Sequence, residues 1–307
     1  MNKSFVHLHA HTEYSMLDGA AKIKDYLKKV SELNQPAAAI TDHGNLYGAL
    51  EFYNEATKIG VKPIIGYEAY VTPNSRFERP ERDKNKRYHL TLLAENNEGY
   101  QNLVELVSKA YLEGYYYKPR IDYELLEEYS NGLIALSGCL GGEIAQFLAP
   151  DGSKEEGNND AVRSYENALL VAKKYQQIFG QENFFIELHN HGIPQQIEIL
   201  PDLVKISKEI GAPLVATNDS HYVEQENSSA HDALLCIKNK TYVNDKNRIK
   251  LSKNHNFKTD KEMFNLFSDL PEALSNNFYL PYKCSFKANH SKPLLPEIAS
   301  AKENSSD

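Results

Sequence analysis

Short apolar runs alternate with longer amphipathic stretches along most of the chain. The runs expected to form strands are Phe5–Leu8, Ala37–Ile40, Pro63–Tyr70, His89–Leu93, Leu133–Leu136, Phe184–Leu188 and Leu214–Ala216. The stretches expected to form helices space apolar residues three and four apart, and they are Ile23–Leu33, Ala49–Lys58, Gln101–Leu112, Ala161–Phe179 and Gln195–Ile210. This alternation predicts βα units around a mainly parallel sheet. Repeated units of this length favour a closed or nearly closed barrel, with an open doubly wound sheet as the alternative.

The composition is that of an ordinary globular protein. Of the 307 residues, 41% are hydrophobic and 25% are charged, which is enough apolar material for a full core. No apolar run approaches the roughly 18 residues that a membrane span needs. Near the N-terminus, His7, His9, His11 and Glu13 stand where a secretory signal would need an uninterrupted apolar stretch. We therefore expect a cytoplasmic protein with no membrane partner.

The charge balance limits how the chain can bind nucleic acid. The formal net charge is −8, whereas non-specific affinity for DNA comes mostly from Lys and Arg that neutralise phosphates. If DNA is the substrate, a neighbouring domain is expected to deliver it. The local exception to the acidic charge is residues 76–87, where six Lys and Arg outweigh three acids, a pattern more typical of a solvated loop. Separately, Tyr115, Tyr116 and Tyr117 stand directly before Lys118. Such tyrosines can stack on bases, although an aromatic run in a turn more often serves local packing.

Residues able to bind metals are found where the expected strands end. His9 and His11 follow the first strand two residues apart, so in an extended backbone both imidazoles point to the same side. The same spacing recurs in Asp219 and His221 after the last strand. The remaining candidates are Asp42, His43, Glu68 and Cys139 at strand ends and His89 at the start of the fourth strand. Because barrel active sites form at the carboxyl ends of strands, these side chains are expected to converge there.

The types of these side chains indicate which metals they suit. Imidazole, carboxylate and thiolate groups together are ligands of Zn²⁺, Mn²⁺ or Fe²⁺, and they disfavour a pure Mg²⁺ site. One His-x-His pair alone more often has a surface or capping role. Agreement among five strand ends is harder to explain by independent structural roles, because buried polar groups are costly.

Other chemistries explain the pattern less well. A thiol hydrolase built on Cys139 would leave the surplus of histidines and carboxylates unexplained. The three cysteines, Cys139, Cys236 and Cys284, are too scattered for a disulfide framework. The sequence has neither GxGxxG nor GxxxxGK[ST], so nucleotide-binding folds have no support.

Six sequence runs resemble the successive motifs of a known family. They are HLHAHT at 7–12 with LDG at 17–19, TDHGNL at 41–46, GYEAY at 66–70, YHLTLLA at 88–94, SGCL at 137–140 and TNDSHY at 217–222. In these runs the chain resembles the PHP (polymerase and histidinol phosphatase) superfamily, and more narrowly the N-terminal domain of bacterial DNA polymerase III α subunits. The resemblance extends through most of residues 5–240, and residues 114–122 and 190–192 also fit the polymerase group.

The resemblance implies a distorted (β/α)7 TIM-like barrel, the PHP fold, with a trinuclear metal centre at the carboxyl ends of its strands. The implied metals are Zn²⁺, Mn²⁺ or Fe²⁺, with Mg²⁺ less favoured. One metal would be held by His9, His11, Glu68 and Asp219. A second, bridged by Glu68, would be held by His89 and Cys139. The third would be held by Asp18, His43 and His221. His189 and His191 are expected near the same rim in a structural or supporting role.

The implied activity is metal-dependent hydrolysis of phosphate esters, and more specifically a 3′–5′ exonuclease acting on single-stranded or mispaired DNA 3′ ends. Asp219, His221 and His43 are the expected catalytic residues, with Asp42 orienting them from behind. Two alternatives stay open. One is a metal-stabilised scaffold domain of the polymerase with weak catalysis, and the other is a free-standing phosphatase for small metabolites.

The expected domain organisation is a barrel over residues 1–240 and an extension over residues 241–307 that leads toward a polymerase region. The tail from about 300 to 307 is expected to be disordered, since it is polar. We find no palm-like stretch with paired catalytic aspartates after residue 240, so nucleotide addition is not expected of this sequence. The remaining domains of a polymerase α subunit are therefore expected partners, together with the DNA 3′ end.

Overall fold

A curled seven-stranded sheet forms the centre of the fold. The computed structural model describes residues 4–81, 84–150 and 162–289, and the tail expected at about 300–307 lies outside them. The strand order is β1-β2-β3-β5-β6-β7, and β4 pairs with β2. The strands are β1 (Ala37–Ile40), β2 (Lys62–Val71), β3 (Tyr88–Ala94), β4 (Arg120–Ile121), β5 (Leu133–Leu136), β6 (Phe184–Leu188) and β7 (Leu214–Ala216). The expected α/β class with a barrel-like sheet is confirmed.

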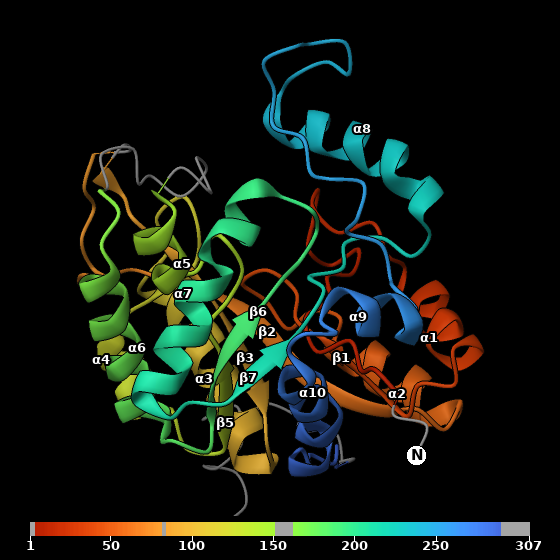
Figure 1. The fold of residues 1–307 in the computed structure, drawn as a ribbon, viewed down its shortest axis with the longest axis horizontal. Helices are drawn as coiled ribbons and strands as arrows, with labels where there is room; N and C mark the ends of the chain where they lie inside the picture. Colours follow the sequence, from red (N-terminus) through yellow and green to blue (C-terminus); the bar gives the residue numbers. More distant parts are fainter. Residues whose placement is uncertain (1–3, 82–83, 151–161, 290–307) are drawn as a thin grey trace, which may run out of the picture.

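Helices surround this sheet (Figure 1). They are α1 (Ile23–Glu32), α2 (Ala49–Lys58), α3 (Asn97–Leu112), α4 (Tyr123–Glu128), α5 (Glu143–Leu148), α6 (Tyr165–Phe179), α7 (Pro194–Ile210), α8 (Ser228–Asn239), α9 (Asp260–Leu266) and α10 (Pro271–Lys283). Side-chain caps fix some of the helix starts, since Asn96 accepts from the Gly99 amide before α3 and Ser164 accepts from the Asn167 amide before α6. Among the described residues, none of these helices is long and apolar enough to span a bilayer.

An extended segment, residues 5–11, bridges the gap between β7 and β1. The carbonyl of His7 accepts a backbone hydrogen bond from Ala39 in β1. On the other side, the amide of Ser220, which follows β7, donates to the carbonyl of His9. The segment therefore closes the curl and brings its histidines to the end of β7.

The expected first strand, Phe5–Leu8, is not a regular strand. The buried side chain of Asn277 in α10 accepts from the Val6 amide at 2.9 Å and donates to the Val6 carbonyl at 2.7 Å. It also donates to the carbonyl of Ala216 in β7 at 3.0 Å. One amide side chain thus takes the place of backbone pairing, which is why the apolar run forms no ladder here.

Strand β3 runs against its neighbours and so differs from the parallel arrangement that βα repeats predict. It pairs antiparallel with both β2 and β5, whereas the β1–β2, β5–β6 and β6–β7 pairs are parallel. The connection from β2 to β3, residues 72–87, has no α-helix among its described residues, and antiparallel strands need no crossover helix. Since His89 at the start of β3 pairs with Tyr70 near the end of β2, His89 lies at the same sheet edge as the parallel strand ends.

The inner face of the sheet changes from apolar to polar toward that edge. Its apolar part is a buried cluster that includes Ala37, Ala39, Ile64, Leu93, Ile134, Leu136, Phe185 and Val215. Side chains alternate along a strand, so Glu68 shares the face of Ile64, and Glu187 shares that of Phe185. The opposite face packs against helices in a separate, larger cluster. The ionisable side chains therefore lie at one end of the inner face, next to the buried apolar cluster.

Residues beyond 240 belong to the same core. Phe257, Met263, Phe267 and Leu280 are each at most 2% exposed, and they join the apolar clusters formed by the sheet and its helices. By contrast, α8 and the stretch that follows it extend away from the sheet (Figure 1). Whether residues 1–240 form a domain by themselves stays a prediction.

Candidate metal centre

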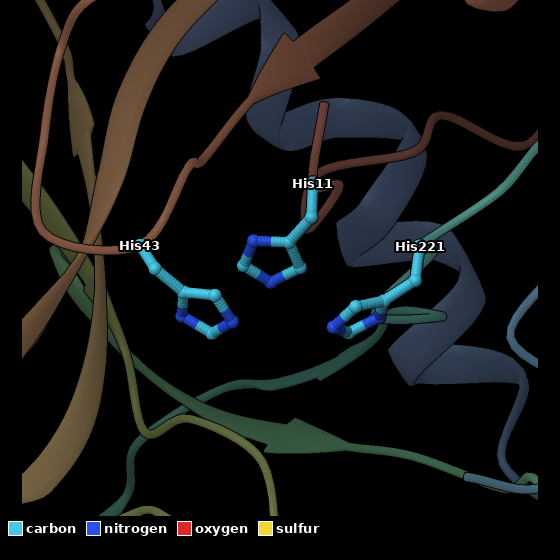
Figure 2. Close-up of side chains that lie close together, drawn as sticks. All are labelled: His11, His43 and His221. Atoms are coloured by element: carbon cyan, nitrogen blue, oxygen red, sulfur yellow. The ribbon is translucent and has the colours of Figure 1, made fainter. Parts of the chain in front are cut away.

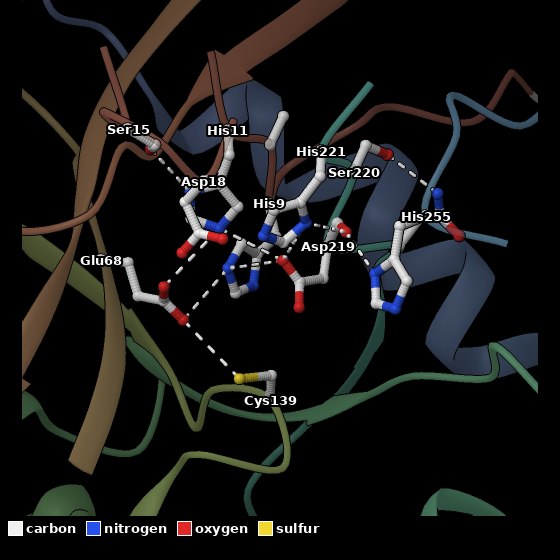
Figure 3. A network of polar contacts seen from close by, with 12 residues as sticks. His9, His11, Ser15, Asp18, Glu68, Cys139, Asp219, Ser220, His221 and His255 are labelled. Atoms are coloured by element: carbon white, nitrogen blue, oxygen red, sulfur yellow. Dashed lines mark hydrogen bonds and ion pairs between the residues drawn. The ribbon is translucent and has the colours of Figure 1, made fainter. Parts of the chain in front are cut away.

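The residues expected to bind metal lie together at the polar edge of the sheet, and we call them the nine-residue cluster. It consists of His9, His11, Asp18, His43, Glu68, His89, Cys139, Asp219 and His221. Figure 3 labels seven of them, all except His43 and His89. The nine come from the strand ends and from the segments beside β1 and β7, so more than two hundred residues of sequence separate the first from the last. The structure brings all nine together, as the sequence predicts.

Glu68, near the end of β2, is the centre of this cluster. One of its oxygens, Oε1, lies 3.3 Å from His9 Nε2 and 3.0 Å from His89 Nδ1. The other, Oε2, lies 3.6 Å from His11 Nε2 and 2.5 Å from His43 Nδ1. Because its two oxygens face different histidines, this carboxylate is placed to bridge two cations.

Asp219 links the histidines of the N-terminal segment to the end of β7. Its Oδ1 lies 3.2 Å from His11 Nε2, 3.6 Å from His9 Nε2 and 3.5 Å from His221 Nδ1. The backbone of Asp219 has φ 43°, a left-handed conformation that non-glycine residues seldom adopt. Strain of this kind is common at functional sites, where the surrounding structure imposes a geometry that local preference does not.

Three histidines of the cluster face one another (Figure 2). The His11 ring lies 4.1 Å from that of His43 and 4.5 Å from that of His221, between ring centroids. Asp18, which precedes α1, approaches from the outer side, with its Oδ2 3.0 Å from His43 Nε2. The residues implied for a third metal therefore lie next to those implied for the first.

Cys139 and His89 complete the cluster on the side of β3 and β5. The Cys139 sulfur lies 3.5 Å from His89 Nδ1 and 3.8 Å from Glu68 Oε1. Gly138 has φ 87°, and a Cβ there would come within 2.6 Å of the His89 carbonyl oxygen. Only glycine fits this turn, which directs the thiol toward Glu68.

The buried donor atoms of the cluster lack hydrogen bonds. His9 Nε2, His11 Nε2 and Asp219 Oδ1 are inaccessible to solvent and have no hydrogen-bond partner among the described residues. Each such atom costs about 1–3 kcal/mol when it is left unsatisfied. Imidazole nitrogens, carboxylate oxygens and a thiol aimed at one point form a donor set suited to Zn²⁺, Mn²⁺ or Fe²⁺. The residues present therefore fit bound cations.

Supporting residues fix which ring nitrogen of each histidine faces the cluster. His9 Nδ1 donates to Glu187 Oε1 at 2.8 Å, which leaves Nε2 without a proton when the ring is neutral. The Ser15 hydroxyl donates to Asp42 at 2.7 Å, so it accepts at 3.1 Å from His11 Nδ1. In the neutral form of each ring, the nitrogen directed into the cluster has a lone pair for a metal.

Asp42 does not reach the cluster directly. Its carboxylate accepts from the amide and the hydroxyl of Thr12, at 2.6 and 2.7 Å, and from Ser15. It therefore holds the turn that carries Ser15, which in turn contacts His11 and accepts from the His43 amide at 3.0 Å. Asp42 thus lies behind the cluster, one hydrogen bond removed from His11, and its orienting role stays a prediction.

The electrostatics of the cluster are dominated by burial and by mutual contacts. Burial opposes the charge of Glu68, but His89 and His43 hold the pKa of its carboxyl well below the usual range. Burial also opposes the charge of His43, but Glu68 and Asp18 raise its pKa to about 9. Burial together with His43 and His221 lowers the pKa of His11 to about 3. The neighbouring histidines therefore hold the buried Glu68 carboxyl in its charged form, and a bound cation can act on it in the same way.

His189 and His191 have supporting contacts instead of facing the centre of the cluster. The Nε2 atom of His189 lies 3.1 Å from Glu187 Oε1 and 2.6 Å from the Thr217 hydroxyl. The Nε2 atom of His191 lies 2.6 Å from the Asn218 carbonyl oxygen. The structure places both behind the first layer of side chains, where a structural role is expected.

Sequence reasoning missed three residues of the site. Glu187 orients His9, Ser15 orients His11, and His255 lies 3.1 Å from the Asp219 carbonyl oxygen through its Nδ1. A signal existed for Glu187, because it is a lone carboxylate inside the apolar strand Phe184–Leu188. No local signal marks His255, which returns to the site from a stretch of weak periodicity.

Comparisons with known proteins agree with this geometry. The family model described as PHP domain matches residues 7–191. The chain is 46% identical over 296 residues to DNA polymerase III subunit alpha of Borreliella burgdorferi, covering 95% of this chain and 25% of that protein. It is 50% identical over 275 residues to the same subunit of Thermus aquaticus, covering 88% of this chain and 21% of that protein. The chain thus spans about a quarter or less of the length of these curated relatives.

Among solved structures, the chain is similar to a two-domain protein from Bacteroides vulgatus that contains a predicted PHP-like metal-dependent phosphoesterase. The two share 12% identity with a TM-score of 0.42, covering 85% of this chain and 62% of that one. The family assignment rests on the sequence matches, because the PHP domain match includes more than half of the chain. With this match over residues 7–191, the chain belongs to the PHP domain family.

Proposed function

We propose that this chain is a metal-dependent phosphoesterase that removes nucleotides from DNA 3′ ends, as the PHP module of a bacterial replicative polymerase. The observation that carries the proposal is the convergence of nine potential ligands, among which His9 Nε2, His11 Nε2 and Asp219 Oδ1 are buried without a hydrogen-bond partner among the described residues. DNA as the substrate, and the remaining polymerase domains as partners in the cytoplasm, are proposed from the similarity to DNA polymerase III subunit alpha.

The proposed ligand sets are those that the sequence motifs imply. His9, His11, Glu68 and Asp219 hold one cation, Glu68 with His89 and Cys139 holds a second, and Asp18, His43 and His221 hold a third. When bound, two or three such cations supply the Lewis acidity and positive charge that phosphate ester hydrolysis needs. The physiological metal among Zn²⁺, Mn²⁺, Fe²⁺ and Mg²⁺ is left to the experiment below.

The chain's own residues position the reacting groups. Asp18 and His43 line a cavity of about 240 Å³ that opens beside the cluster, so the phosphate is expected to approach from their side. Glu187 and Ser15 keep the His9 and His11 lone pairs directed inward. Asp42 acts through Ser15 and is a positioning residue, whereas Asp219, His221 and His43 face the reacting atoms.

A nuclease assay with matched variants tests the proposal. Protein loaded with Mn²⁺, Zn²⁺ or Mg²⁺ is incubated with single-stranded and 3′-mispaired DNA, and its metal content is measured in parallel. We expect Asp219→Ala and His9→Ala to lose bound metal and nuclease activity together, while Asp269→Ala, at an exposed position, keeps both. Activity that persists in the metal-free protein would refute the proposal.

The same assay separates the two alternatives. A scaffold domain would bind metal, and lose stability without it, while hydrolysing neither DNA nor small phosphate esters. A free-standing phosphatase would hydrolyse small sugar or amino-alcohol phosphates and leave DNA ends intact.

A further inference from the structure

A group of exposed aromatic rings stands at the mouth of the metal centre. The cavity beside the cluster has Asp18 and His43 at one end and Tyr47, Tyr111 and Tyr115 among its other lining residues. We call these three tyrosines the tyrosine rim. Their exposed fractions are 59%, 37% and 54%, which is high for large aromatic side chains.

The rings of the tyrosine rim lie side by side. Tyr111 and Tyr115 are stacked, with centroids 6.0 Å apart and planes at 25°, and Tyr47 lies 6.5 Å from Tyr111. They come from two distant parts of the sequence, the segment before α2 and the end of α3 with the turn that follows. The fold therefore assembles them at the mouth, in contact with solvent.

Local packing explains only part of the tyrosine run at 115–117. Tyr116 is the packing residue, because its hydroxyl donates to the Pro80 carbonyl at 2.7 Å and its ring contacts the guanidinium groups of Arg79 and Arg120. Tyr115 is directed the other way, toward the cavity. Local packing therefore accounts for Tyr116, whereas Tyr115 lines the cavity.

Positive charge accompanies these rings although the chain as a whole is acidic. Lys118 and Lys238 line the same cavity. The Lys118 ammonium lies 5.0 Å from the Tyr70 ring centroid, and Lys238 donates to Asp18 Oδ2 at 3.0 Å. Lysines beside exposed aromatic rings are the combination by which proteins bind single-stranded nucleic acid without sequence preference.

We propose that the tyrosine rim stacks on unpaired bases next to a DNA 3′ end and so directs the terminal phosphodiester to the metal centre. The inference rests on the proposed function. It adds a means by which the site would distinguish unpaired DNA ends from paired ones. A base exposes its face for such stacking only when it is terminal or unpaired, so frayed and mispaired ends bind better than paired ones. Stacking on an aromatic ring is worth about 5- to 150-fold in affinity for each base.

A fluorescent oligonucleotide measures this stacking without turnover. The probe is oligothymidylate that ends in 2-aminopurine, joined through a phosphorothioate linkage, and its fluorescence is quenched on stacking. We expect Tyr115→Ala and Tyr47→Ala to weaken probe binding by at least about fivefold each and to remove the quenching. Tyr115→Phe retains a ring and should bind as the wild type does.

The control variant is Tyr282→Ala. Tyr282 is 70% exposed, and the carbonyl of the preceding Pro281 is bonded to Lys62 at the start of β2, the strand end opposite to Glu68. This change should alter binding by less than about twofold. Unchanged circular dichroism of each variant excludes unfolding as the cause of a loss.

Two results would overturn the inference. One is wild-type affinity in both alanine variants, and the other is equal affinity for a probe with an abasic 3′ terminus. Hydrolysis of bis(p-nitrophenyl) phosphate by the metal-loaded wild-type protein is measured separately. Its absence, together with intact DNA ends, would refute the phosphoesterase proposal, whereas its presence without stacking would refute the tyrosine rim alone.

Discussion

Single residues behind the nine-residue cluster hold the side chains that we propose as metal ligands. Glu187 is buried and accepts a hydrogen bond from His9. Ser15 accepts a hydrogen bond from His11 and donates one to Asp42, which holds it in place. The nine ligand candidates could be predicted because their motifs are local in sequence. Their supporting residues were harder to predict, because a hydrogen bond such as that between His9 and Glu187 joins positions 178 residues apart.

Removing the carboxylate behind His9 should weaken metal binding. In Glu187→Gln the amide can no longer hold His9 Nδ1–H as a charged acceptor does, so the ring loses basicity and orientation. We expect about a 10- to 100-fold loss of metal affinity, measured by competition with a chromophoric chelator. Glu182→Gln, at an exposed position near the start of β6, is the matched control. Equal affinity in both variants would show that Glu187 has no such role.

The buried carboxyl of Glu143, which lies outside the nine-residue cluster, should make the free energy of unfolding depend on pH. Burial raises the pKa of Glu143, although the hydroxyls of Tyr123 and Tyr175, which donate to it, act in the opposite direction. A raised folded-state pKa means that folding takes up a proton, so this contribution to stability is present below the unfolded-state pKa near 4.5 and is lost as the pH rises through the folded-state pKa.

Urea denaturation tests this sign. Relative to Glu143→Gln, the wild-type free energy of unfolding should fall as the pH rises above about 4.5. A pH-independent difference for Glu143→Gln would contradict the expected titration.

Among strands and helices, apolar periodicity predicted where most elements lie but not how they are joined. Six of the seven expected strands are present, yet periodicity says nothing about direction, and β3 is antiparallel. That reversal explains why His89, at the start of its strand, still reaches Glu68. The prediction of a strand at Phe5–Leu8 was wrong for a different reason. The side chain of Asn277, in a helix more than 260 residues away, forms hydrogen bonds with the backbone of Val6 in place of a neighbouring strand.

Asn277→Ala should destabilise the protein strongly. The change leaves the Val6 amide and the Val6 and Ala216 carbonyls without the buried partner that now serves all three. We expect the free energy of unfolding to fall by about 3 kcal/mol or more, measured by chemical denaturation. Tyr279→Ala, on the exposed side of the same helix, should cost much less. A loss below about 1 kcal/mol in Asn277→Ala would show that water or rearrangement replaces the side chain.

In the molecule as a whole, residues after 240 contribute side chains to the same apolar core as the sheet, so we expect them to be needed for its folding. Phe257, Met263, Phe267 and Leu280 are buried there, and burying each such side chain contributes about 1.5–3 kcal/mol. The free energy lost if all four were no longer buried is comparable with the whole free energy of unfolding of a typical domain, about 5–15 kcal/mol. Weak periodicity after Cys236 suggested a boundary near 240, because residues 241–259 form no helix or strand and α9 has only seven residues.

Truncation tests this account of the folding unit. A chain that ends at residue 240 should lack near-ultraviolet circular dichroism and a cooperative thermal transition, whereas a chain that ends at residue 289 should retain both. Cooperative unfolding of the shorter chain would instead support an independent barrel over residues 1–240.

Anomalous diffraction from crystals grown with Mn²⁺ or Zn²⁺ tests the central claim most directly. The account predicts two or three strong peaks within coordination distance of the nine-residue cluster, at least one of them contacted by Glu68, and their loss in Asp219→Ala crystals. A cluster without peaks, or peaks confined to other parts of the molecule, would contradict it.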